Sequence, residues 1–174
     1  VVGNPKDEYI LAFDPSWSES ESSDDFAMLL IKLNRDTRKG TVVHSYALSG
    51  SSLKTHIKYM AYILTHFNVA AVVGDYNGGV QFINSCNESE IFKKKNLNLG
   101  VIEADLDKSK DYDKNLRRLK NQYNKSEKKF VFLRKPTSAW IRLANESLQS
   151  AFDHKRIFFA GAAMNDDYNN QRKS

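Results

Sequence analysis

Apolar runs alternate with short polar segments along the chain, and their lengths predict a mixture of strands and helices. Tyr9–Asp14 is an apolar run that ends on a carboxylate, and Pro15 then prevents a strand ladder from continuing. Phe26–Leu33 and Thr41–Leu48 predict two further strands, separated by the turn-forming residues Asn34–Gly40. The short connections favour an antiparallel meander of these three strands.

The middle of the chain changes to helical spacing. Apolar residues over Leu53–Phe67 recur at helical intervals and predict an amphipathic helix, which Ser51 or Ser52 can cap. Val69–Val73 is short and wholly apolar, as is typical of a central parallel strand covered on both faces. A second helix is expected to begin over Val80–Ile83.

Further α/β units follow. The segments are a polar stretch Glu88–Asn98, strands Leu99–Ala104 and Phe130–Leu133, and a charged stretch Asp105–Lys129 with a helix near Tyr112–Tyr123. Thr137 or Ser138 can cap a helix to about Phe152, whose apolar stripe is Trp140, Leu143, Ala144, Leu148 and Ala151 or Phe152. A short apolar segment Arg156–Ala160, a turn Gly161–Asn165 and a last helix near Asp166 complete the pattern.

Composition narrows the class of protein. The 174 residues are 41% hydrophobic and 27% charged, which fits one globular domain, residues 1–174, that we expect to be part of a longer chain. The formal net charge of +5 is compatible with a polyanionic partner. No apolar run approaches the roughly 20 residues of a membrane span, and no charged-then-apolar leader is seen.

The cysteine and histidine residues argue against an internal disulfide and against a zinc site. Cys86 is the single cysteine, so no internal disulfide is possible and a reducing compartment is expected. The four histidines, His44, His56, His66 and His154, show no zinc-ligand spacing. We expect His56 and His66 at the surface or at helix caps.

Two strands end on aspartate. Asp14 ends the first strand, and Asp75 follows the apolar strand Val69–Val73, with Gly78 and Gly79 allowing a tight turn beyond it. Adjacent parallel strands would bring the two carboxylates together, where they repel unless a metal ion lies between them. Carboxylate oxygens favour Mg²⁺ or Mn²⁺, and a pair of ions suits phosphodiester hydrolysis. Asp14 alone could instead cap an Asp-Pro turn.

Other acids are candidates with competing explanations. The loop Ser16–Asp25 holds Glu19, Glu21, Asp24 and Asp25, which form either a solvated loop or a lip beside a metal site. Asp166 and Asp167 also suit the positive N-terminus of a helix.

The chain resembles the ribonuclease H-like nucleases, and among them the C-terminal nuclease domain of the large terminase subunit of tailed phages. The resemblance rests on Phe13–Ser16 followed by Ser23–Met28, similar to a "DPA" and "DDFA" opening. Val72–Gly79 is similar to the second acidic motif, and Asn165–Tyr168 to a C-terminal "HDD" motif with Asn in place of His. The implied fold is an α/β mixed sheet, three antiparallel strands and then parallel strands, flanked by helices.

The resemblance implies a metal-dependent endonuclease that cuts concatemeric viral DNA during genome packaging. Asp14 and Asp75 would be core ligands of two Mg²⁺ or Mn²⁺ ions, with Asp167 preferred over Asp166 as the third and Asp25 as an auxiliary ligand. Glu103 and Asp105 are replacement candidates for the third. The implied partners are double-stranded DNA and, in the full protein, an ATPase domain, the small terminase subunit and the portal. The implied location is the host cell cytoplasm, transiently at the procapsid.

Basic segments and two rival functions complete the expectations. Lys93–Lys95 and Arg117–Lys129 are expected to position DNA phosphates without reading sequence, unless they are simply solvated faces. One rival is a catalytically silent scaffold of the same fold. The other is an actin-like ATPase, which needs a glycine-rich phosphate loop after the first strand, whereas the loop here is rich in Ser and Glu. No Walker A pattern occurs, so no ATP hydrolysis is expected.

Overall fold

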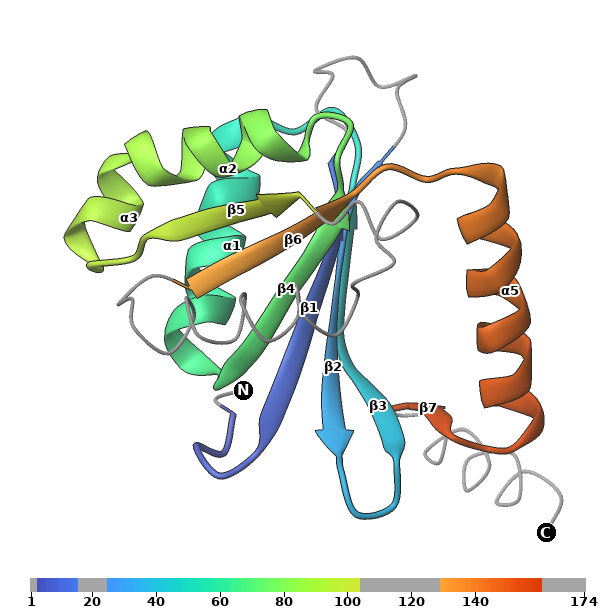
Figure 1. Cartoon of the computed structure of the whole chain (residues 1–174). Coiled ribbons are helices and arrows are strands. Elements are labelled where there is room, and N and C mark those ends of the chain that lie inside the picture. The colour runs from blue at the N-terminus through green and yellow to red at the C-terminus, as the bar shows by residue number, and fades with distance from the viewer. Residues whose placement is uncertain (1–2, 16–24, 104–128, 161–174) are drawn as a thin grey trace, which may run out of the picture.

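Figure 1 shows a computed structural model of the chain, which describes residues 3–15, 25–103 and 129–160. The strands are β1 (Glu8–Asp14), β2 (Phe26–Asn34), β3 (Lys39–Leu48), β4 (Val69–Asp75), β5 (Leu99–Glu103), β6 (Lys129–Arg134) and β7 (Ile157–Phe159). The helices in these ranges are α1 (Leu53–His66), α2 (Gly79–Glu88), α3 (Glu90–Lys94) and α5 (Ser138–Asp153). The helix predicted near Tyr112–Tyr123 and the one near Asp166 lie outside the described residues.

The described strands form one seven-stranded sheet in the order β5-β6-β4-β1-β2-β3-β7. β1, β2 and β3 are antiparallel neighbours, as the short connections predicted. β4 lies parallel to β1, β6 parallel to β4, and β5 parallel to β6. The predicted α/β mixed sheet, with three antiparallel strands followed by parallel strands, is therefore confirmed. β7 extends it by pairing parallel to β3, a contact that the sequence pattern did not indicate.

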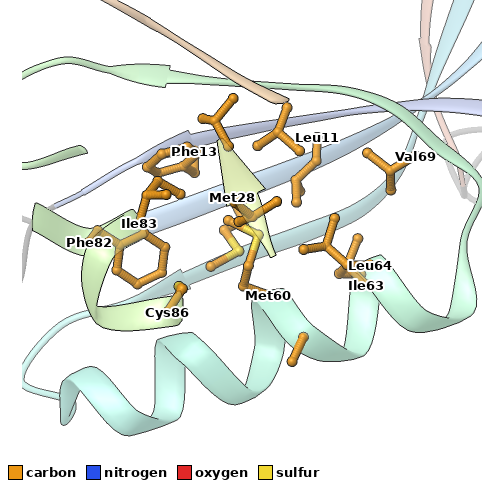
Figure 2. Packing of buried hydrophobic residues seen from close by; sticks show 14 of the residues in the cluster. Leu11, Phe13, Met28, Met60, Ile63, Leu64, Val69, Phe82, Ile83 and Cys86 are labelled. Atoms are coloured by element: carbon orange, nitrogen blue, oxygen red, sulfur yellow. The ribbon is translucent and has the colours of Figure 1, made fainter. Parts of the chain in front are cut away.

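One face of the sheet carries the hydrophobic core. Alternate residues of β1, Tyr9, Leu11 and Phe13, are buried, as a strand with one covered face requires. α1 and α2 cover this face, and Figure 2 shows their side chains packing onto those of the strands. The helices contribute Ile57, Met60, Ile63, Leu64, Phe82, Ile83 and Cys86 to this cluster. Burying a side chain of this size is worth about 1.5–3 kcal/mol, so this layer dominates the stability of the fold.

The opposite face of the sheet is more open. Leu29 on β2 and Val73 on β4 point to this side and are 38% and 37% exposed. The prediction that Val69–Val73 is covered on both faces is therefore wrong for Val73. Helix α5 connects β6 to β7 across the molecule (Figure 1), and none of its 16 residues is buried.

A side-chain cap is present at two helices, one of them predicted, and absent at a third where it was expected. The hydroxyl of Thr137 accepts a hydrogen bond from the backbone N–H of Trp140 and caps α5 as predicted. The hydroxyl of Ser89 does the same for α3 through Phe92, a helix that the polar composition of this segment concealed. Ser52 lies at the N-cap of α1, but its side chain accepts no capping hydrogen bond.

His56 corrects one expectation from the sequence. Its side chain is 1% exposed, stacks on Phe26 at 4.2 Å between ring centroids, and hydrogen-bonds through Nδ1 to the hydroxyl of Tyr46 at 2.8 Å. The prediction of a surface or capping position is wrong because residue 56 lies on the same helical stripe as Met60 and Ile63. Burial lowers the pKa of this imidazole.

Candidate active site

Asp14 and Asp75 end two neighbouring parallel strands. The register of β1 and β4 runs to the pair Phe13 and Gly74, and each aspartate is the next residue of its strand. Neighbouring strands lie about 4.8 Å apart, so the two aspartates leave the sheet side by side at the carboxyl ends of β1 and β4. Asp14 is exposed and Asp75 half-buried, which leaves both near solvent. The expected pairing of these two strands as parallel neighbours is present, and the role of Asp14 and Asp75 as metal ligands stays a prediction.

Gly74 and Phe13 set the spacing immediately below the two acids. A Cβ atom added to Gly74 would lie 2.5 Å from Cζ of the Phe13 ring, far inside contact distance. The Phe13 ring itself packs against Phe82 of α2, with 5.5 Å between ring centroids. Only glycine therefore lets β4 lie against this ring, and the ring is fixed by the core beneath it.

A tight turn follows Asp75 and directs the chain into α2. A carboxylate oxygen of Asp75 accepts a hydrogen bond from the backbone N–H of Asn77 at 2.8 Å. Gly78 has a φ of 77°, which favours glycine, and it is the N-cap of α2. A Cβ on Gly79 would lie 2.9 Å from Cδ2 of Leu133, so the second glycine allows close packing. The two glycines thus serve the different purposes of turning and close approach.

Asp25 lies at the same end of the sheet. Ala27 of β2 pairs with Asp14 in the antiparallel register, and Asp25 precedes β2 by one residue. It is exposed. Its position fits the auxiliary role that the sequence suggested, and nothing in its immediate geometry assigns that role.

The remaining predicted ligands are placed only in part. Asp105, Asp166 and Asp167 lie outside the described residues, so the third ligand stays a prediction. Glu103 is the last residue of β5. Its register partner is Leu133 of β6, so it lies at the same end of the parallel strands as Asp75. Within residues 3–15, 25–103 and 129–160, no three His, Cys, Asp or Glu side chains gather closely enough to hold a metal ion.

The predicted basic segments are distant from the two acids where they are described. Lys93–Lys95 precede β5, which runs parallel to β4, so they lie near the amino ends of the parallel strands. Lys129 begins β6 at that same end, and burial lowers its pKa. Most of Arg117–Lys129 lies outside the described residues. Lys93–Lys95 would therefore contact only DNA that extends a strand's length beyond Asp14 and Asp75.

Two other cationic residues lie at the end of the sheet that carries Asp14 and Asp75, and reasoning from the sequence missed them. Arg134, the last residue of β6, is the register partner of Asp75, and its carbonyl accepts a hydrogen bond from the N–H of Tyr76. The Arg134 guanidinium carbon lies 5.1 Å from the Trp140 ring centroid. Nζ of Lys135 lies 4.5 Å from the ring centroid of Tyr76. The sequence feature that could have revealed them is a pair of basic residues at the end of an apolar strand, the same position that Asp14 and Asp75 occupy in β1 and β4.

The strand order defines the fold class. Three antiparallel strands, with the first flanked on its other side by a parallel strand, make this a ribonuclease H-like α/β fold. In the described ranges, no helix combines the length and apolar character needed to cross a bilayer.

Comparison with solved structures adds a structural likeness. No protein-family model matches the sequence. No curated protein sequence matches it significantly. Among solved structures, the chain is similar to the large terminase nuclease domain of bacteriophage SPP1, solved with bound manganese. The two share 15% sequence identity over 49% of this chain at a TM-score of 0.38, and the match spans 45% of that structure's chain.

Proposed function

We propose that this chain is a metal-dependent DNA endonuclease and that Asp14 and Asp75 are its central carboxylates. The observation that carries the proposal is the register of β1 and β4, which brings the two acids to adjacent strand ends. Two carboxylates at this spacing are costly to leave charged side by side, and a shared cation offsets that cost. The terminase assignment rests on the sequence motifs around Asp14 and Asp75.

The residues present fit part of a two-ion site. Asp14 and Asp75 supply hard oxygen ligands near solvent, which suits a hydrated Mg²⁺ or Mn²⁺ ion that keeps several waters. Asp25, one residue before β2, would be an auxiliary ligand. When bound, the two ions would activate the attacking water and stabilise the leaving 3′ oxygen.

The chain's own groups would orient the substrate. Gly74 lets β4 pack closely against the Phe13 ring of β1, just below the two carboxylates. The hydrogen bond from the Asn77 N–H to one carboxylate oxygen orients the Asp75 side chain. Cutting would be nearly independent of sequence, since the proposed contacts are to phosphates.

The wider setting belongs to the proposal as well. The substrate would be concatemeric double-stranded DNA, cut during genome packaging in the host cytoplasm. In the full protein, an ATPase domain would move the DNA, and the small terminase subunit and the portal would be the other partners.

Plasmid nicking with Mn²⁺, with and without a chelator, tests the proposal. Asp14→Asn and Asp75→Asn should abolish cleavage, and Asp36→Asn should not, because Asp36 is an exposed aspartate in the turn at the opposite end of the sheet. Native protein that is folded yet leaves DNA intact with Mn²⁺ would favour a silent scaffold. Cleavage that survives in Asp14→Asn or Asp75→Asn would remove that residue from the site.

A further inference from the structure

Arg134 is placed beside the acid pair by the sheet itself. It is the register partner of Asp75, so the ends of β1, β4 and β6 present Asp14, Asp75 and Arg134 in a row. Residues paired in a parallel register point to the same face of the sheet. The register therefore places the backbone of Arg134 beside that of Asp75, on the same end of the sheet as Asp14.

An aromatic ring supports each of the two cations. Trp140, in the first turn of α5, lies under Arg134, and the cap from Thr137 to the Trp140 N–H fixes that turn. Tyr76 lies under Lys135 and packs against the hydrophobic core. A cation held on an aromatic face is restrained to one region of space and keeps its charge there. The two cations are thus positioned by the fold, unlike solvated lysines on a helix surface.

The chemistry of such a pair suits phosphate. A stacked guanidinium directs its N–H donors in the plane of the group, where they match two phosphate oxygens. Lysine adds a point charge. An acidic centre that must accept a polyanion needs neighbouring cations, because carboxylates alone repel the phosphate backbone.

We propose that Arg134 and Lys135 form a phosphate-binding pair that holds a DNA strand beside Asp14 and Asp75. The inference rests on the proposed nuclease function and adds the groups that position its substrate. The ligand is the phosphodiester backbone, recognised without regard to base sequence. Within residues 3–15, 25–103 and 129–160, the register places Arg134 closer to the acids than Lys93–Lys95.

Binding of a short fluorescent DNA duplex without metal, in excess chelator, tests the pair separately from catalysis. The logarithm of the association constant falls linearly with the logarithm of salt concentration, and each phosphate contact contributes a slope of roughly 0.9. Arg134→Gln and Lys135→Gln should each weaken binding of unrelated sequences equally and reduce the slope by about 1. Lys39→Gln is the matched control, because Lys39 also rests on a ring, that of Phe158, at the opposite end of the sheet.

A conservative variant separates phosphate binding from a purely structural role. Arg134→Lys keeps the charge but loses the planar stack on Trp140, so it should retain most of the salt slope with weaker affinity. Native slopes in folded Arg134→Gln and Lys135→Gln would overturn the inference, as would an equal loss in Lys39→Gln. So would an Arg134→Lys protein that binds no better than Arg134→Gln.

The two proposals fail in different ways. Native protein that nicks plasmid with Mn²⁺ while the Gln variants bind DNA normally overturns only the phosphate-binding pair. Native protein that neither binds nor nicks DNA overturns the nuclease proposal, and the pair with it.

Discussion

Asp75 lies opposite Arg134 in the register of β4 and β6, while its other neighbour, β1, ends in Asp14. The strand that ends in Asp75 thus lies between one strand that ends in an acid and one that ends in a base. Removing either acid relieves the repulsion between them, but removing Asp75 also takes away the acidic neighbour of Arg134. The two aspartates should therefore differ in their effect on stability, although both are required for cleavage.

We expect Asp14→Asn to stabilise the apo protein slightly more than Asp75→Asn, with changes within about 1 kcal/mol because the site is near solvent. Thermal melts without metal measure this difference. Adding Mn²⁺ should raise the melting temperature of the native chain and leave both variants unchanged, because an ion that binds only the folded state stabilises it. A Mn²⁺-dependent rise of native size in either variant would contradict a shared ion.

Gly74→Ala should lower stability by about 1–3 kcal/mol, because the new methyl group meets the Phe13 ring and the strands must part. The cleavage rate should fall by more than the loss of folded protein explains, since parting β1 from β4 separates Asp14 from Asp75. Chemical denaturation and plasmid nicking measure the two effects.

A second change tests the cause. Phe13→Leu removes the ring, so the double variant Gly74→Ala/Phe13→Leu should be more stable than the sum of the two single effects predicts. Gly40→Ala is the control at the opposite end of the sheet, where a Cβ would lie 3.1 Å from Ile31 Cγ2 and should cost less. Additive effects would show that the ring does not dictate glycine at this position.

The stability of the protein should fall as pH falls below 6.5. Burial lowers the pKa of His56 below its ordinary value of 6.5, so the unfolded chain takes up a proton in a range where the folded protein does not. The loss begins near pH 6.5 and ends once the pH has passed below the lowered pKa of the folded state. His44, whose pKa burial also lowers, acts in the same direction.

Denaturation series at several pH values measure this effect. His56→Gln should be less stable at neutral pH, since the contacts with Phe26 and Tyr46 are lost, but its stability should depend less on pH. The double variant His44→Gln/His56→Gln should depend least. A native pH dependence in His56→Gln would assign the effect to other groups.

Cys86 should resist thiol reagents in the native state. It is fully buried in the core, and burial raises the pKa of its thiol well above the ordinary range. Labelling should therefore follow global unfolding, and Mn²⁺ should slow it if the ion binds the folded protein. Rapid labelling under native conditions would show that the core between the sheet and helices α1 and α2 opens locally.

The sequence predicted what depends on local pattern. Strand lengths, the helix over Leu53–His66 and the acids that end β1 and β4 follow from periodicity and from the preference for ligands at strand ends. His56 was predicted at the surface because histidine is polar. Its spacing of four residues from Met60 nevertheless puts it on the buried stripe of the helix.

Features set by distant pairing were not predictable. The place of Arg134 beside Asp75 depends on the register of β4 and β6, which are separated in the chain by more than fifty residues. The addition of β7 to β3 likewise depends on where α5 ends. A single sequence does not reveal which distant strands pair or in what register. The strands could therefore be predicted, but not that Arg134 lies beside Asp75 or β7 beside β3.

Helix α5 is joined at one end to β6, beside the acids, and at the other to β7, which closes the far side of the sheet through three register pairs with β3. With no side chain in its 16 residues buried, this helix is, among the described helices, the one that a protease should cut first. A single nick there would release the outermost strand from its covalent link to β6, while the six inner strands would keep their order and both aspartates their place.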